Sequence, residues 1–388
     1  MIRMRYKLKD IFDLQIGKTP SRNNSEYWNT EDHKWISIAD LTRTGKYISE
    51  TKEYLSENAI QKSGIKVIPA NTVVMSFKLS IGKTAITAED MYSNEAIMAF
   101  LDKHVVEVLP EYILYMFKFK NWDEGSNEAV MGKTLNKAIL SEIEIDICPI
   151  EEQRVIVDVL DKMMLALENR ENELFLLDDL IKARFVEMFG NSVLNEKGWI
   201  TDTVDNLCKE IYGGGTPSKV HPEYYKDGDI PWVSSKDMKT DILTDSQIKI
   251  NQMGVENSTA RMVPVNSVIM VIRSGILKHT LPVAINAVPI TVNQDLKVFI
   301  PSERILTRFL AVQFKMHEKD ILTGVRAVTA DNIEFNSLKQ RKLIVPSIEL
   351  QQEYVLFLEQ VDKSKVAVQK ALDETQMLFD SLMQKYFG

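Results

Sequence analysis

The chain has 388 residues, 45% hydrophobic and 26% charged, and a formal net charge of −8. This is enough to bury cores in two or three domains. The net charge taken as a whole argues against nucleic-acid binding, but residues 1–148 and 191–345 are close enough to neutral to carry local basic patches. The sequence has no run of about 18 apolar residues that could span a membrane and no export segment at its start. We therefore expect a cytoplasmic protein that does not associate with a membrane.

The sequence is an internal duplication, visible first in a turn near the N-terminus. The tripeptide Thr-Pro-Ser at 19–21 recurs at 216–218, an offset of 197. Gly17 precedes the first turn and three glycines, 213–215, precede the second, and we expect them to let the backbone turn tightly. Two diverged copies of one unit indicate one kind of task performed on two different objects.

The two larger segments, 1–148 and 191–345, are predicted to be globular domains. Short β-branched runs such as 72–75 and 267–272 lie between turn clusters, and no regular alternation of strand and helix is present. The pattern therefore predicts two α+β domains with short strands and long loops.

The two smaller segments, 149–190 and 346–388, are each predicted to form one long helix. Each begins after a proline with acidic residues nearby, which suits the first turn of a helix, and the chain's excess of acid lies in these segments. Apolar residues alternate at steps of four and three, a heptad seam, and its positions correspond between the helices at an offset of 198. The seam residues are Ile156, Leu160, Met163, Leu167, Leu174, Leu177, Ile181 and Met188 in the first helix and Tyr354, Leu358, Val361, Val368, Leu372, Phe379, Leu382 and Tyr386 in the second.

The matched seams favour pairing of the two helices with each other. Polar residues interrupt the seams at different positions, Arg170 and Arg184 in one and Lys365 and Thr375 in the other, as a heterotypic pair would require. A homodimer, or packing of each helix on its own domain, is the alternative.

No catalytic or metal-binding pattern recurs in the two copies. The 5 histidines are scattered without ligand spacing, and Cys148 and Cys208 have no metal-spaced partners. Neither a nucleophile elbow nor the Asn-Pro-Pro or Asp-Pro-Pro signature of a base-modifying methyltransferase is present. We therefore predict no catalytic residue and no metal, and favour a reader or scaffold over an enzyme.

Side chains suited to polar recognition do recur. The hydroxyls of each Thr-Pro-Ser turn and the cation after it are suited to contact a DNA phosphate. Arginine can make a bidentate contact with guanine, whereas lysine makes a single-point contact, and side-chain amides can contact the edge of adenine. Ordinary turns and solvated surface charge are the alternatives. The candidate DNA-binding residues are Thr19, Ser21, Arg22, Lys78, Lys83 and Asn94 in the first copy and Thr216, Ser218, Lys219, Arg273, Lys278, Asn293 and Gln294 in the second, with Lys78 and Lys83 matching Arg273 and Lys278 at an offset of 195.

Taken in order, these elements resemble the specificity subunits of type I restriction-modification enzymes. The resemblance rests on the Gly-x-Thr-Pro-Ser turn, the tryptophan after it at Trp35 or Trp232, the Pro-x-Asn-x-Val-Val strand, and a long helix ending in Phe-Gly. It covers both copies. The second helix departs from the first by one extra residue between Pro346 and the glutamine that follows.

The resemblance implies two target-recognition domains separated by two long antiparallel coiled-coil helices, with pseudo-twofold symmetry. Each domain would read one half of a split sequence in double-stranded DNA, and the chain would have no catalysis and no cofactor of its own. Its implied partners are two modification subunits, which carry S-adenosylmethionine, and restriction subunits, which use ATP and Mg. A non-enzymatic scaffold bridging protein partners is the alternative, and an unrecognised nuclease is a third possibility.

Overall fold

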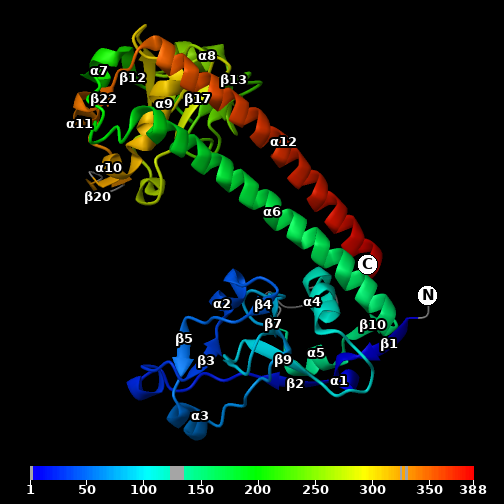
Figure 1. The fold of residues 1–388 in the computed structure, drawn as a ribbon. Coiled ribbons are helices and arrows are strands. Elements are labelled where there is room, and N and C mark those ends of the chain that lie inside the picture. Colours follow the sequence, from blue (N-terminus) through cyan, green and yellow to red (C-terminus); the bar gives the residue numbers. More distant parts are fainter. Residues whose placement is uncertain (1–2, 123–134, 324–325, 328–330) are drawn as a thin grey trace. The chain divides into compact units, whose positions relative to one another are not determined.

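The computed structural model describes residues 3–122, 135–323, 326–327 and 331–388, and these form two compact units (Figure 1). The first unit extends to Glu171 and also takes in Lys370–Gly388, and the second is Asn172–Gln369. Each unit therefore combines one globular part with segments of both long helices. The sequence boundaries at 148, 190 and 345 remain predictions. Within the described ranges, no helix is long and apolar enough to cross a membrane.

The globular part of the first unit is built on a five-stranded sheet in the order β2-β9-β6-β7-β4. These strands are β2 (Phe12–Ile16), β9 (Ile97–Asp102), β6 (Val73–Ser76), β7 (Thr84–Thr87) and β4 (Tyr47–Ile48). A three-stranded sheet contains β5 (Glu53–Leu55), β3 (His33–Ile36) and β8 (Tyr92–Ser93), and β1 (Met4–Lys7) pairs with β10 (Glu144–Ile147). The helices are α1 (Leu8–Ile11), α2 (Ile38–Arg43), α3 (Glu57–Ser63), α4 (Pro110–Phe119) and α5 (Lys137–Glu142), with a 3-10 turn at Ser25–Tyr27.

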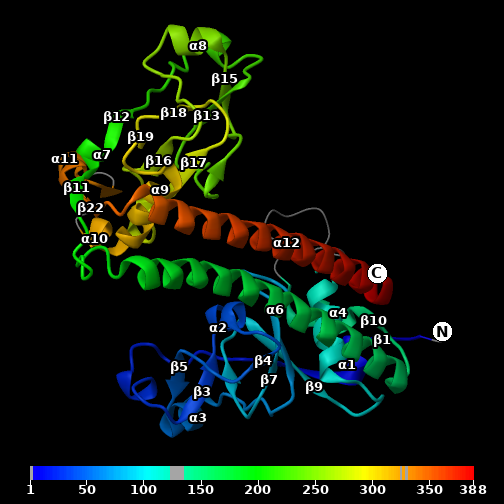
Figure 2. The ribbon, with the colours of Figure 1, turned by 45° about the horizontal axis from the view of Figure 1, so that its top comes forward.

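The second unit repeats this plan with its five-stranded sheet in the order β12-β19-β16-β17-β14 (Figure 2). These strands are β12 (Cys208–Gly213), β19 (Leu296–Pro301), β16 (Val268–Val271), β17 (Val283–Asn286) and β14 (Ile242–Leu243). The smaller sheets contain β15 (Lys249–Ile250), β13 (Ile230–Val233) and β18 (Thr291–Val292), then β11 (Thr201–Thr203) with β22 (Lys342–Ile344), and β20 (Arg326–Ala327) with β21 (Asp331–Asn332). The helices are α7 (Val204–Leu207), α8 (Gln252–Glu256), α9 (Thr307–Met316), α10 (Glu318–Thr323) and α11 (Phe335–Gln340), with 3-10 turns at Pro222–Tyr224 and Gly275–Lys278.

The two sheets match in register as well as in strand order. Val73 faces Phe100 across β6 and β9, and Val268 faces Phe299 across β16 and β19. The central strands are buried along their whole length, because helices and loops cover both faces. The predicted duplication and the predicted α+β class, with short strands and long loops, are confirmed.

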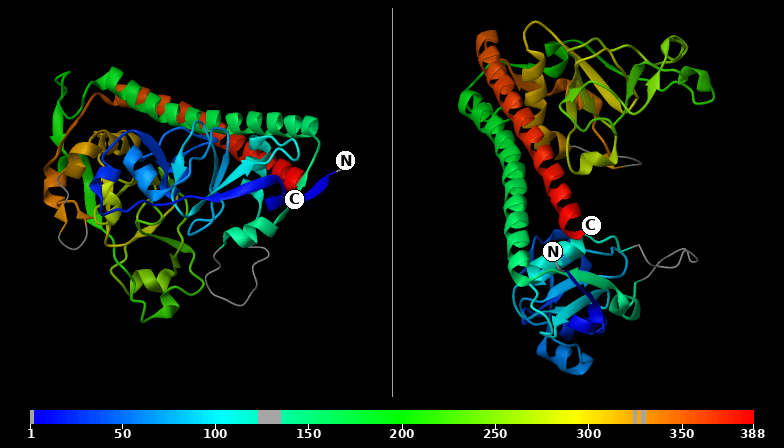
Figure 3. Two further views of the ribbon diagram at one scale, coloured as in Figure 1. Left: turned by 90° about the horizontal axis from the view of Figure 1, so that it is seen from below. Right: turned by 90° about the vertical axis from the view of Figure 1, so that its right-hand side faces the viewer.

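The two long helices, α6 (Ile150–Phe189) and α12 (Ile348–Phe387), have 40 residues each. In the second unit the end of α6 lies antiparallel to the start of α12, where Arg184 donates to Glu353 over 3.0 Å and the Tyr354 hydroxyl donates to the Ile181 carbonyl over 3.0 Å (Figure 3). In the first unit the start of α6 and the end of α12 share a buried cluster through Leu160 and Met383. The predicted antiparallel helix pair is confirmed.

All predicted seam residues are buried or half-buried, but the seam also belongs to the domain cores. Tyr354 and Leu358 lie in the core of the second unit together with Phe185 and Phe189, which are not on the predicted seam. The Phe189 ring centroid lies 5.1 Å from Phe309 and 5.6 Å from Tyr354. Helix pairing and packing on the globular part, which the sequence left as alternatives, therefore occur together.

A buried glutamine joins each globular part to the start of the next long helix. Gln153 accepts from the Leu109 amide over 2.9 Å and donates to the carbonyls of Glu107, over 3.0 Å, and Cys148, over 2.8 Å. Gln351 accepts from the Leu306 amide over 2.9 Å and donates to the carbonyls of Arg304, over 3.0 Å, and Pro346, over 2.9 Å. The extra residue noted after Pro346 therefore precedes the helix, and both glutamines hold the same position.

Candidate nucleic-acid interface

Each Thr-Pro-Ser turn is preceded by a glycine that lies against a neighbouring strand. A Cβ on Gly17 would overlap the carbonyl oxygens of Ser93 and Asn94, and one on Gly214 would overlap that of Val292. Neither glycine has a positive φ, so a left-handed backbone is not the reason for glycine at these positions. Glycine is needed here because two backbone segments approach too closely for a side chain.

A buried tryptophan fixes the position of each turn. The Trp35 indole donates to the Lys18 carbonyl over 3.1 Å, and the Trp232 indole donates to the Gly215 carbonyl over 2.9 Å. The loop therefore starts from a rigid base, which a recognition surface requires.

The two turns carry the same hydrogen bond to different partners. The Thr19 hydroxyl donates to the Glu95 carboxylate, and the Thr216 hydroxyl donates to the side-chain oxygen of Gln294. Both partners are exposed and directly follow the predicted asparagines. An acceptor-only carboxylate in one copy thus corresponds to an amide that also donates in the other.

In the first unit, three predicted residues gather around Glu95. The hydrogen bond from Thr19 holds the pKa of Glu95 below its usual value, and the charges of Lys78 and Arg22 act in the same direction. The Arg22 guanidinium pairs with Glu53 and lies 3.8 Å from the centre of the Trp28 ring. Arg22 is therefore oriented before any ligand arrives.

The other predicted residues of the first copy lie in the same region. Ser21 is exposed and its carbonyl accepts from the Trp28 indole over 3.1 Å. Asn94 uses its side-chain oxygen to accept from the Ala96 amide over 3.0 Å, which stabilises the loop. Lys78 and Lys83 lie on the hairpin that joins β6 to β7.

In the second unit, Thr216, Gln294 and Arg273 gather beside Asp295. Arg273 donates through Nε to Asp295 over 2.6 Å, and Asn293, which is buried, donates to the same carboxylate over 3.2 Å. Ser218 and Lys219 are exposed at the turn, where the Ser218 hydroxyl accepts from the Val220 amide over 3.3 Å. Asn293 is thus engaged inside the loop, whereas Arg273 and Gln294 are at the surface.

The expected equivalence of Lys83 and Lys278 is wrong. The Ser76 amide donates to the Lys83 carbonyl over 2.9 Å, and the corresponding Val271 amide donates to Pro282 over 3.1 Å. Residues inserted in the second hairpin place Lys278 in a 3-10 turn, away from the position of Lys83. Lys78 and Arg273 still occupy equivalent positions, because each lies just after one of the matched strands.

The gathered groups are hydrogen-bond donors, acceptors and fixed cations rather than a reaction centre. In the described part of the chain, no three His, Cys, Asp or Glu side chains are placed to hold a metal ion. An arginine that a carboxylate holds in place, with a side-chain amide beside it, can form hydrogen bonds with base edges and with phosphates.

Sequence reasoning missed Glu53 and Asp295, which orient the two arginines, and left Glu95 out of the candidate set. Glu95 and Gln294 were detectable, because each follows an asparagine at matched positions of the duplication. Glu53 was not detectable, because it reaches Arg22 in a loop from strand β5, and no sequence spacing encodes that contact.

Comparison with known proteins agrees with this picture over most of the chain. A family model described as the type I restriction modification DNA specificity domain matches residues 4–174 and 196–375. The specificity subunit of the type I restriction enzyme MjaIX of Methanocaldococcus jannaschii is 24% identical, over 98% of this chain and 91% of the relative. A type I restriction enzyme specificity subunit of Escherichia coli is 38% identical over 39% of this chain and 38% of its own. The crystal structure of a type I restriction-modification S subunit from M. genitalium has the same fold, with a TM-score of 0.56 and 14% identity over 100% of this chain and 96% of that one.

Proposed function

This chain belongs to the type I restriction-modification DNA specificity family, and on that premise we propose that its two globular domains each read one half of a bipartite, asymmetric DNA sequence. The chain is the non-catalytic DNA-recognition subunit of such a system, and its partners are DNA and the other subunits. The observation that carries the proposal is one buried framework, built twice, with different polar groups at the matched loops.

The candidate reading groups are Arg22, Lys78 and Glu95 in the first domain and Arg273 and Gln294 in the second. The two arginines are held by carboxylates and therefore lose little freedom on binding. Glu95 accepts hydrogen bonds, as cytosine requires, whereas Gln294 both accepts and donates, as adenine requires. Among the other candidates, the turn residues Thr19, Ser21, Thr216, Ser218 and Lys219 suit phosphate contacts.

The two long helices set the distance between the half-sites. A helix of 40 residues is about 60 Å long, enough to separate two half-sites by roughly one turn of DNA. Because the chain is a duplication, it offers two equivalent surfaces, and we propose that two modification subunits occupy them. Those subunits would supply S-adenosylmethionine, and restriction subunits would supply ATP and Mg chemistry, all in the cytoplasm.

The proposal is tested by sequencing the methylated bases of cells that express this chain with its modification subunit. A split motif of two different short halves is expected. Replacing residues 191–345 with the second domain of another family member should change one half of the motif and leave the other intact. A continuous or palindromic motif, or simultaneous change of both halves, contradicts the proposal.

A measurement of DNA binding distinguishes this function from the alternative, a scaffold that bridges protein partners. Electrophoretic mobility shifts with the modification subunit, repeated across salt concentrations, should show steeply salt-dependent binding, because phosphate contacts release counterions. A scaffold would shift no DNA at any salt concentration.

A further inference from the structure

The two units also differ in how they fill the space between the sheet edge and the long helices. In the first unit this place is filled by the chain itself. Lys46 donates to both carboxylate oxygens of Asp161 over 2.7 Å, and the Tyr115 hydroxyl donates to the same carboxylate over 2.5 Å. Tyr47, beside Lys46, donates to Glu111 over 2.5 Å. A cation and two aromatic rings therefore close this position.

The matched place in the second unit is an open cavity of about 430 Å³. The Ile285 amide donates to the Asp241 carbonyl over 2.8 Å, as the Ile86 amide does to Lys46 over 3.0 Å, so Asp241 stands where Lys46 stands in the first unit. By the same registers Ile242 replaces Tyr47, and Val312 replaces Tyr115. Smaller side chains and a reversed charge leave the space empty.

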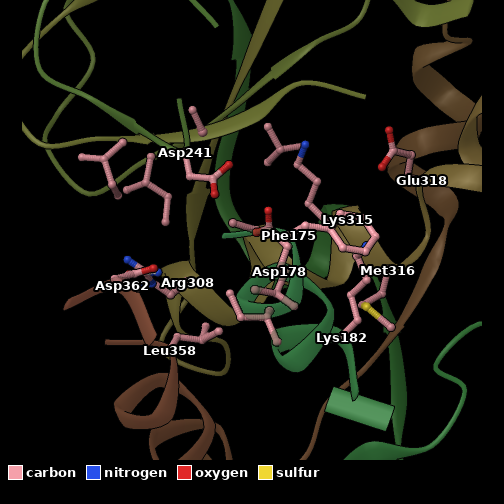
Figure 4. A pocket seen from close by; sticks show the side chains of 17 residues that line it. Phe175, Asp178, Lys182, Asp241, Arg308, Lys315, Met316, Glu318, Leu358 and Asp362 are labelled. Atoms are coloured by element: carbon pink, nitrogen blue, oxygen red, sulfur yellow. Dashed lines mark hydrogen bonds and ion pairs between the residues drawn. The ribbon is translucent and has the colours of Figure 1, made fainter. Parts of the chain in front are cut away.

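The cavity is lined by apolar side chains and by charged ones that have partners, with Asp241 as the exception. Asp178 pairs with Lys365, Lys182 with Asp179, Lys315 donates to the Leu281 carbonyl and Glu318 accepts from Thr280. Val283, Ile285 and Leu358 are buried in its lining, and Figure 4 shows Asp241 coming from the sheet side, with Arg308 and Asp362 from the helices. Arg308 pairs with Asp362 over 2.5 Å. In contrast, no partner for the Asp241 carboxylate exists among the residues that the structure describes.

We propose that this cavity receives a segment of a partner protein in which a lysine or arginine adjoins an aromatic side chain. The inference rests on the proposed function, because it takes the occupant from a modification subunit of the same complex. Charge complementarity identifies the chemistry, since the first unit fills the matched place with a lysine and tyrosines while the second offers Asp241 to a cation. The free carboxylate disfavours a DNA phosphate, and the volume lies in the range that buries such groups.

The first test places a photo-crosslinking benzoylphenylalanine at Ile242 in the full chain, purified with its modification subunit. The expected product joins Ile242 to a modification-subunit peptide with a basic residue next to an aromatic one. The matched control at Tyr47 should give at least about fivefold less product. A crosslink to DNA or to a second copy of this chain, or equal yields at both positions, overturns the inference.

The second test fills the cavity from within. The double change Asp241→Lys and Val312→Tyr rebuilds the side chains of the first unit, and it should weaken binding of the modification subunit at least about tenfold by calorimetry. Asp241→Asn keeps the cavity shape and removes only the charge, so it should weaken binding about fivefold, as expected for one exposed ion pair. Unchanged affinity in Asp241→Asn overturns the inference even if the double variant does not fold.

These outcomes separate the inference from the proposed function. If the complex methylates a split motif but gives no crosslink at Ile242, only the cavity proposal is contradicted. A complex that crosslinks at Ile242 but recognises no DNA sinks only the recognition proposal.

Discussion

The two globular domains share three buried or close-packed contacts that hold the frame and differ in side chains at matched surface positions. The glutamine clamp, the tryptophan bond to the turn and the close-approach glycine occur in both, with the same atoms bonded. The surface groups at matched positions differ, as Glu95 against Gln294 and Lys78 against Arg273 show. Buried hydrogen bonds therefore maintain the frame, because an unpaired buried group is costly, whereas exposed side chains can be replaced without that cost and so change what the surface binds.

The largest expected effect comes from breaking the clamp in one copy at a time. Gln153→Leu leaves an amide and two carbonyls without partners, and Gln351→Leu does the same in the second copy. In each copy one of these bonds is buried and two are partly buried. At about 1 to 3 kcal/mol for the buried group and about 0.5 to 1.5 kcal/mol for each of the others, either change should cost at least about 2 kcal/mol.

Hydrogen exchange measured by mass spectrometry locates this loss. The Leu109 amide should exchange faster in Gln153→Leu, and the Leu306 amide in Gln351→Leu, each without change in the other copy. Gln352→Leu, at the exposed neighbouring position, is the control. Equal acceleration in both copies would mean that the units are not independent.

A smaller loss is expected from adding a methyl group at the close-approach glycines. Gly17→Ala and Gly214→Ala force a strand and a turn apart and should cost about 1 to 3 kcal/mol each by urea denaturation. Gly45→Ala is the matched control, because its Cβ would meet no atom within 4 Å. Full stability of Gly17→Ala would show that the turn relaxes without cost.

The frame was predictable from the sequence because its signals are periodic or repeated. The long helices follow from heptads and prolines, and the strands from β-branched runs at matched offsets, and the structure has a helix of 40 residues in each copy.

The loop contacts were not predictable, because they join residues with no fixed spacing. Arg22 meets Glu53 and Lys46 meets Asp161 through the tertiary fold alone. Insertions add a second difficulty, since the offset that equates Lys83 with Lys278 is displaced by the longer second hairpin. The cavity beside Asp241 was not predictable for the same reason, because its lining comes from sheet, loop and helix segments with no fixed spacing in the sequence.

A pH-dependent difference of about 2 kcal/mol is expected between the units. His317 ends α9 where Lys120 ends α4, and burial lowers the pKa of His317 from 6.5 to about 4. His317 is 2% exposed, and neither of its ring nitrogens has a hydrogen-bond partner in the described part of the chain. Between pH 6.5 and 4, His317 is therefore protonated in the unfolded chain but stays neutral in the folded one.

The stabilising term is thus complete above pH 6.5 and is lost as the pH falls toward 4. By pH 5 the loss is about 2 kcal/mol, at 1.36 kcal/mol for each unit of pKa difference. Urea denaturation at pH 7 and pH 5 should show it in the wild type and much less in His317→Leu. An equal pH response in both proteins would show that His317 is not the titrating group.

The smallest effect is expected from exchanging the two matched cations at the surface. Arg273 makes a bidentate contact available where Lys78 offers a single point, so Arg273→Lys should lower discrimination in the second half-site by about 1 kcal/mol, and Lys78→Arg should sharpen the first. Asp295 holds the Arg273 guanidinium in place through a hydrogen bond. Asp295→Asn should therefore cause part of the same loss of discrimination in the second half-site while leaving the arginine unchanged. Methylation rates measured on oligonucleotides with single changes in each half separate the two sites. If Arg273→Lys altered the first half as strongly as the second, the cations would act through overall charge, and the matched loops would not be reading separate sequences.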